Sequence, residues 1–108
     1  MSETLRRVQT LVRRGEVVAS QHGFRELAAD DILLDVVIVG IEAAIAIEDY
    51  ADAGRGPSVL VLQYDEYNRP IHVVWGIHNN TTTPAVIVTA YRPDPLLWSA
   101  DFIMRSKA

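Results

Sequence analysis

Cysteine is absent from this sequence of 108 residues, and so is any long apolar run. Without cysteine, disulfide frameworks and thiolate zinc sites are excluded, which fits a reducing compartment. Without an apolar run of about 18 residues, no membrane-spanning helix is expected. The first residues also lack the apolar stretch of a secretory signal, so we expect a cytoplasmic protein with no membrane contact.

Positive charge is in the minority, because the chain has 10 Lys and Arg residues against 14 Asp and Glu residues, which gives a formal net charge of -4. A negative balance weighs against broad binding to nucleic acid. The charge is unevenly placed, however. Arginines crowd the N-terminus at positions 6, 7, 13 and 14, whereas acidic residues fill the middle of the chain. The net charge therefore does not describe the local field at any one surface.

The length and the 49% hydrophobic content predict one domain with a real core. Residues 1–16 read as an N-terminal amphipathic helix that precedes a single α+β domain over residues 17–108. Apolar residues recur at helical spacing at Leu5, Val8, Leu11 and Val12. This stripe predicts packing against the domain or against a second copy of the chain, as in a homodimer.

Three strand-like runs at 58–64, 71–77 and 85–91 are joined by short polar connections, which predicts an antiparallel meander. Residues 43–50 alternate in polarity and predict a further strand, although their alanine content leaves a helix open. We therefore predict an α+β fold with a four-stranded, mainly antiparallel sheet and helices packed on one face.

Two further helices are predicted between the N-terminal helix and the sheet. After an extended link at 17–19, Ser20 is a candidate cap for a helix that carries His22 and Arg25. Asp30 or Asp31 then caps a helix from residue 32 to about 39. Near the C-terminus, Trp98 and Phe102 are four apart and predict a short helix that packs back on the domain.

Alternation along the strands predicts which side chains share a face. Trp75 belongs to the core-facing set of its strand, and His72 to the opposite set. On the last strand, Val86, Val88 and Ala90 are predicted beneath the helices. Thr89 and Tyr91 then lie on the face that carries His72.

These residues fit the cleavage of RNA without a metal ion. The reaction needs a base for the ribose 2′-hydroxyl, an acid for the leaving oxygen, and a cation for the developing charge. We take the candidate catalytic residues to be His22, Arg25, His72, Thr89 and Tyr91. Each of them has a structural alternative, in which the side chain only satisfies a neighbouring group of the fold.

Other sites are poorly supported by the sequence. The three histidines lack the spacing of a metal site, so neither a metal ion nor another cofactor is predicted. The loop at 52–57 contains two glycines and a proline around Arg55. It is interpreted as a plain connection, with anion binding by its backbone amides as the alternative.

Several short motifs occur in a distinctive order: Ser20 to Arg25, Arg55 to Ser58, Pro70 to Val74, Thr89 to Asp94, and Trp98. In these motifs the chain resembles the bacterial family known as domain of unknown function 4258, over roughly residues 17–99. The resemblance implies a fold similar to that of the BrnT and RelE toxins, and a metal-independent ribonuclease activity. It also implies that His22, Arg25, His72, Thr89 and Tyr91 line one site.

Two functions are therefore open. The first is a toxin-like endoribonuclease, with RNA as its substrate and an antitoxin protein as its partner. The alternative is a non-catalytic protein-interaction module, in which the N-terminal helix joins two copies as a homodimer.

Overall fold

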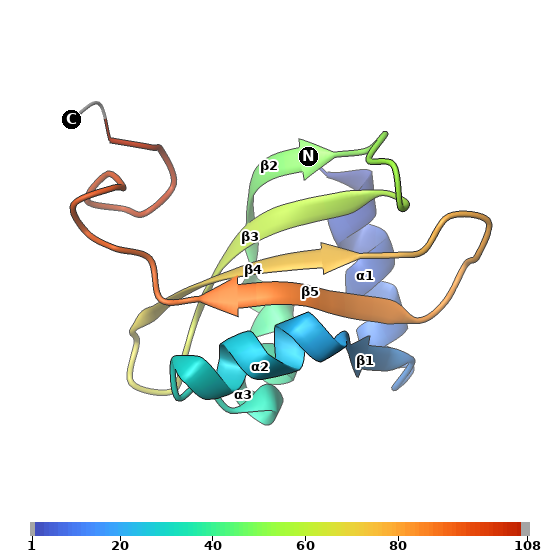
Figure 1. Cartoon of the computed structure of the whole chain (residues 1–108), viewed down its shortest axis with the longest axis horizontal. Coiled ribbons are helices and arrows are strands. Elements are labelled where there is room, and N and C mark those ends of the chain that lie inside the picture. The colour runs from blue at the N-terminus through green and yellow to red at the C-terminus, as the bar shows by residue number, and fades with distance from the viewer. Residues whose placement is uncertain (1, 107–108) are drawn as a thin grey trace.

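A computed structural model describes residues 2–106 (Figure 1). It confirms an α+β fold, with one five-stranded sheet in the order β1-β5-β4-β3-β2. The strands are β1 (Val17–Ala19), β2 (Ile45–Tyr50), β3 (Ser58–Tyr64), β4 (Pro70–Gly76) and β5 (Ala85–Tyr91). The helices are α1 (Glu3–Arg13), α2 (Gln21–Ala29), α3 (Leu34–Gly40) and the short 3₁₀ helix η1 (Ile41–Ala43). No helix in residues 2–106 is long and apolar enough to cross a membrane.

The prediction of four strands is wrong, because residues 17–19 form a fifth strand rather than a link. β1 lies parallel to β5 and pairs Val17 with Ala85, so the sheet is mixed. The backbone of Ala85 donates to the carbonyl of Glu16 over 2.9 Å, and Ser20 donates to the carbonyl of Ile87 over 3.0 Å. The segment therefore satisfies polar groups that β5 would otherwise leave unpaired at its edge.

The antiparallel meander is confirmed, and so is a strand within residues 43–50. Trp75 and His72 lie on opposite faces of β4, as alternation predicts. Trp75 is fully buried in the core beside Val59, which pairs with it on β3. His72 pairs with Tyr91 on the other face.

The facing predicted for β5 is partly wrong. A β-bulge shifts the register between Val74 and Trp75, so that Val74 pairs with Thr89 but Trp75 pairs with Ile87. Ile87 therefore belongs to the core, whereas Val86 and Val88 line the opposite face. A bulge adds one residue to a strand and so reverses the alternation beyond it.

Helix α1 matches its prediction and packs on the same core as the rest of the chain. Ser2 caps the helix, because its Oγ accepts from the backbone N–H of Leu5 over 3.0 Å. Leu5, Val8 and Leu11 are buried in the core. Figure 1 shows α1 lying across one face of the sheet. The apolar stripe is thus covered within the chain, and a homodimer is not needed to bury it.

Helix α2 begins at the predicted cap, since Ser20 Oγ accepts from the backbone N–H of Gly23 over 2.9 Å. The predicted cap of α3 is wrong, because this helix follows Leu33 and has no side-chain cap. The Asp30 carboxylate instead accepts from the backbone N–H of Arg92 over 2.8 Å. Asp31 has a φ of 53°, which turns the chain between α2 and α3, while Asp30 ties this turn to the residue that follows β5.

Candidate functional site

His72 and Tyr91 face each other across β4 and β5. The hydroxyl of Tyr91 lies 3.2 Å from His72 Nδ1, and His72 Nε2 lies 2.8 Å from the carbonyl oxygen of Phe102. A carbonyl only accepts, so Nε2 carries the hydrogen and Nδ1 accepts from Tyr91. His72 is 0% exposed. Both ring nitrogens are therefore occupied inside the protein.

Residues 94–106, which we call the C-terminal strap, cover this pair. The Trp98 ring meets the His72 ring edge-on, with their centroids 4.4 Å apart. The guanidinium of Arg105 lies 4.8 Å from the centroid of Trp98, and its Nη2 lies 2.8 Å from Glu48 Oε1 on β2. The strap is thus fastened to the sheet by one aromatic contact, one carbonyl and one exposed ion pair.

The strap contains no helix, so the short helix predicted for Trp98 and Phe102 is wrong. Phe102 has a φ of 62°, which reverses the chain, and the carboxylate of Asp101 accepts from the backbone N–H of Ile103 over 3.2 Å. An aspartate bound to the backbone two residues later is typical of a turn. The predicted packing is confirmed, because Trp98 is buried against His72.

Burial changes the protonation of both members of the pair. It lowers the pKa of His72, and the nearby charge of Arg105 acts in the same direction, while the hydrogen bond to Phe102 opposes them. Burial also raises the pKa of Tyr91. Both side chains are thus neutral beneath the strap.

We expect the folding stability of the protein to fall as the pH drops below about 6.5, where His72 takes up a proton in the unfolded chain but not in the folded one. Trp98→Ala removes the cover, so the pKa of His72 should rise towards its usual value and this pH dependence should weaken. NMR titration of the ring measures the pKa of His72, and thermal melts across the same pH range measure how stability depends on pH. Leu97→Ala is the matched control, because Leu97 is 60% exposed. An identical His72 titration in wild type and Trp98→Ala would contradict the expectation.

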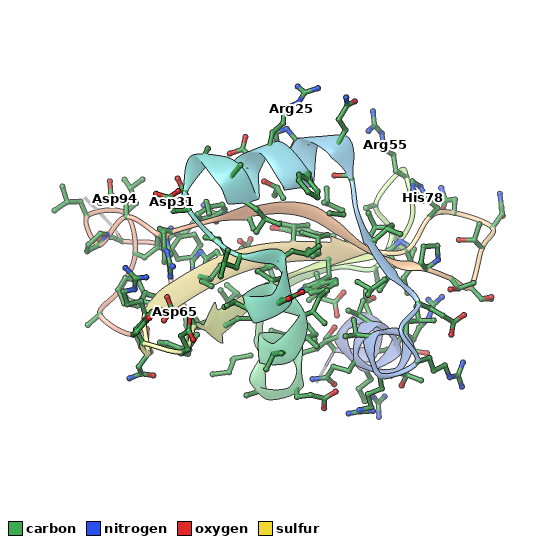
Figure 2. All side chains as sticks on the ribbon, turned by 90° about the horizontal axis from the view of Figure 1, so that it is seen from below. Arg25, Asp31, Arg55, Asp65, His78 and Asp94 are labelled. Carbon is green, nitrogen blue, oxygen red and sulfur yellow. The ribbon has the colours of Figure 1, made fainter. Side chains whose placement is uncertain are left out.

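His22 and Arg25 lie on the outward face of α2. A Cβ added to Gly23 would lie within 3 Å of the Ile87 carbonyl oxygen, and Leu27, one turn later, is buried. The inner face of the helix is therefore set by these two residues. The His22 side chain is 65% exposed, with Nε2 3.6 Å from Glu26 Oε1. Figure 2 shows Arg25 pointing away from the sheet.

The predicted convergence of these side chains on one anion is therefore wrong for this conformation. His72 and Tyr91 are in contact, and Thr89, which pairs with Val74, is the next residue of β5 on the same face. An anion cannot touch His72 because the strap closes it to solvent. The catalytic role of the five residues stays a prediction, but they do not form one open site.

An open groove lies on the same sheet face beyond Thr89, and we call it the sheet groove. Its volume is about 650 Å³. The floor is apolar and consists of Val74, Gly76, Val86 and Val88. The rim carries three basic side chains from three separate segments, namely His22, Arg55 and His78.

The loop that carries Arg55 is latched to the end of β4. The backbone N–H of Asn79 donates to the carbonyl of Arg55 over 3.0 Å, and that of Ile77 donates to Pro57 over 3.1 Å. Gly56 has a φ of 124°, and a Cβ there would lie 2.0 Å from the Ile77 carbonyl oxygen. Only glycine permits so close an approach. The loop and His78 are thus held together, as Figure 2 shows for Arg55 and His78.

The groove rim offers two imidazoles and one guanidinium at the mouth of an apolar cavity. An imidazole accepts or donates a proton near neutral pH, and a guanidinium binds a phosphate through paired N–H groups. No three His, Asp or Glu side chains within residues 2–106 are grouped so as to hold a metal ion. Sequence reasoning missed His78 as a site residue. Its place next to the end of a strand, and the glycines around Arg55, were the available signals.

Comparison with known proteins gives one match. No curated protein and no solved structure is significantly similar to the chain. Residues 19–92 match the family described as "Domain of unknown function (DUF4258)". The matched region runs from the end of β1 to just after β5, so it contains α2, the sheet groove and the His72–Tyr91 pair. Because the match covers more than half of its length, the chain belongs to the DUF4258 family.

Proposed function

We propose that this protein is a metal-independent endoribonuclease whose reaction takes place at the sheet groove. The observation that carries the proposal is the position of His22, His78 and Arg55 around the mouth of one cavity. The three residues come from α2, from the end of β4 and from the loop before β3. Neither imidazole belongs to the core, and His22 Nε2 lies 3.6 Å from Glu26 Oε1 on the same helix.

These groups match the needs of RNA cleavage. One histidine removes the proton of the ribose 2′-hydroxyl, and the oxygen attacks the adjacent phosphorus. The bond from phosphorus to the 5′ oxygen breaks, and the second histidine gives this oxygen a proton. Arg55 stabilises the charge that builds on the phosphoryl oxygens. The products are a 2′,3′-cyclic phosphate and a free 5′-hydroxyl, so atoms and charge balance without a further reactant.

The groove also suits the rest of a nucleotide. Its volume of about 650 Å³ is within the range of small-ligand sites, roughly 300–1,000 Å³. The valine floor offers an apolar surface to the face of a base. The side chains of Val74, Val86 and Val88 have no hydrogen-bonding groups, so we expect this floor to contribute little preference among the four bases.

The sequence motifs resemble the DUF4258 family, and the likeness of that family's fold to BrnT and RelE toxins supports the same reaction class. In that reading the His72–Tyr91 pair supports the sheet face next to the groove, and an antitoxin protein neutralises the enzyme in the cell. A reading frame for such a protein beside the gene is the expected genetic companion.

The test is cleavage of a short single-stranded RNA, with a fluorophore and a quencher at its ends, in the presence of EDTA. We expect cleavage, and we expect none when the scissile nucleotide has a 2′-deoxyribose, because the nucleophile is then missing. A His22→Ala/His78→Ala double variant prepared in the same way controls for contaminating nuclease. If wild type is no faster than the double variant, the ribonuclease proposal is wrong and a non-catalytic interaction module becomes the better reading.

A further inference from the structure

A second hollow, lined by arginines, lies on the outer face of α1. Its volume is about 380 Å³, and Arg6, Arg7 and Arg14 line it together with Glu3, Thr10, Leu11 and Thr82. Within residues 2–106, none of these three guanidiniums forms an ion pair. Arg13 differs, because its Nε lies 2.9 Å from Glu42 Oε1. The hollow thus carries three arginines against the one carboxylate of Glu3, a local excess of positive charge in a chain whose net charge is -4.

Helix geometry places these charges in a row. Arg6 and Arg14 are eight residues apart, which is about 12 Å along a helix axis. Arg7 lies beside Arg6 on the same hollow. The opposite face of α1 is anchored in the core by Leu5, Val8 and Leu11, so the row is presented on a rigid support.

The connection between β4 and β5 joins this row to the sheet groove. His78 lines the groove, and Thr82 lines the arginine hollow. Four residues of chain span at most about 14 Å. Both figures place α1 at the end of the molecule where this connection lies. The groove and α1 lie on opposite faces of the sheet, so an RNA strand that occupies both hollows passes around this end of the sheet. A strand of about ten nucleotides is long enough for this path.

We propose that Arg6, Arg7 and Arg14 bind backbone phosphates of the RNA strand whose scissile bond lies in the sheet groove. The inference rests on the proposed ribonuclease function and adds the part of the surface that holds the flanking nucleotides. Guanidiniums pair with phosphate oxygens through two parallel hydrogen bonds, so each of the three arginines can hold one backbone phosphate. Binding sites for single strands commonly cover about 4–16 nucleotides.

The experiment measures binding without cleavage. A ten-nucleotide RNA with 2′-O-methyl riboses cannot be cleaved, and fluorescence anisotropy gives its Kd over a range of salt concentrations. For Arg6→Gln/Arg7→Gln/Arg14→Gln we expect the slope of log K against log salt to lose about 2, since each lost phosphate contact of a single strand removes about 0.7. At 0.1 M salt this corresponds to a roughly 100-fold weaker affinity. Glutamine is a good helix former, so α1 should persist, and a thermal melt checks this.

Two comparisons make the result specific. Arg13→Gln, on the same helix but paired with Glu42, should leave the slope unchanged. A three-nucleotide strand, too short to span both hollows, should bind wild type and the triple variant alike. If the triple variant keeps the wild-type slope, or if Arg13→Gln lowers it equally, the arginine row does not hold RNA.

The experiments distinguish failure of the arginine row from failure of the ribonuclease proposal. Cleavage by wild type with an unchanged salt slope would reject the arginine row and keep the ribonuclease. Salt-dependent binding that needs the row, without cleavage, would reject the ribonuclease and keep the RNA surface. Tighter binding of a ten-residue polyglutamate peptide than of the RNA would overturn the inference in favour of an acidic protein partner.

Discussion

His22→Ala and His78→Ala are each expected to slow RNA cleavage by roughly 100- to 10,000-fold, the usual scale for losing a general acid or base. Both side chains are exposed at the rim of the sheet groove and neither belongs to the core. Their removal should therefore leave the fold intact and affect the reaction alone. Single-turnover rates with excess enzyme measure the chemical step directly.

The pH dependence of the rate distinguishes the two roles. Wild type should show a bell-shaped profile, because one histidine must be neutral and the other protonated. Each single variant should lose one limb of the bell. Phe24→Ala is the matched control, since Phe24 lies on the same helix as His22, is 60% exposed and does not line the groove, and its rate should equal that of wild type. Losses below about tenfold for both histidines would contradict the assignment.

A variant of His72 tests whether the reaction takes place at the sheet groove or beneath the strap. The sequence alone predicts His72 as a catalytic residue, whereas the strap buries it completely. His72→Asn should therefore lower the free energy of unfolding. The rate of RNA cleavage per folded molecule should change little. A rate loss as large as that of His78→Ala, in a variant that stays folded, would place the chemistry beneath the strap and require the strap to open.

Local sequence patterns predicted most of the elements that surround these sites. The polar connections between apolar runs predicted the meander, and Ser20 predicted the start of α2. The strand β1 was missed because it has only three residues and its partner, β5, follows almost 70 residues later. Such pairing depends on a distant edge rather than on local alternation.

The shared face of His72 and Tyr91 was predictable, because it depends on local alternation alone. Both residues lie on the same side of the bulge in the ladder between β4 and β5, so simple alternation holds for them. Alternation failed for Val86 and Val88 beyond the bulge, because an inserted residue leaves no periodic signal in a run of similar aliphatic side chains.

The rim of the sheet groove could not be assembled from the sequence. Spacing shows that His22 and Arg25 are neighbours on a helix, but it does not show which face of the helix turns to the sheet. The contact of the Arg55 loop with residues 77–79 depends on backbone hydrogen bonds between distant segments. The strap is equally irregular, because its turns are made by side-chain contacts of Asp94, Ser99 and Asp101 rather than by a repeating pattern.

The largest change in stability is expected from substitution of Trp75, which begins a chain of two hydrogen bonds through the core. Trp75 Nε1 donates to Gln63 Oε1 over 2.8 Å, and Gln63 Nε2 donates to the carbonyl of Val37 in α3 over 2.9 Å. Trp75 is 0% exposed and Gln63 is 1% exposed. Trp75→Ala should lower the free energy of unfolding by about 3–5 kcal/mol through the lost contacts and the cavity. This is a large part of the roughly 5–15 kcal/mol typical of a domain.

A double-mutant cycle separates the hydrogen bond from the packing, with urea unfolding as the measurement. Trp75→Phe keeps much of the apolar contact but leaves the buried Gln63 Oε1 unpaired, which costs about 1–3 kcal/mol. Adding Gln63→Leu removes that unpaired oxygen, so the double variant should be more stable than the sum of the two single losses predicts, by about 0.5–3 kcal/mol. Simple additivity would show that the polar chain does not tie β4 to β3 and α3. In that case the stability of the sheet beneath the groove would come from apolar packing alone.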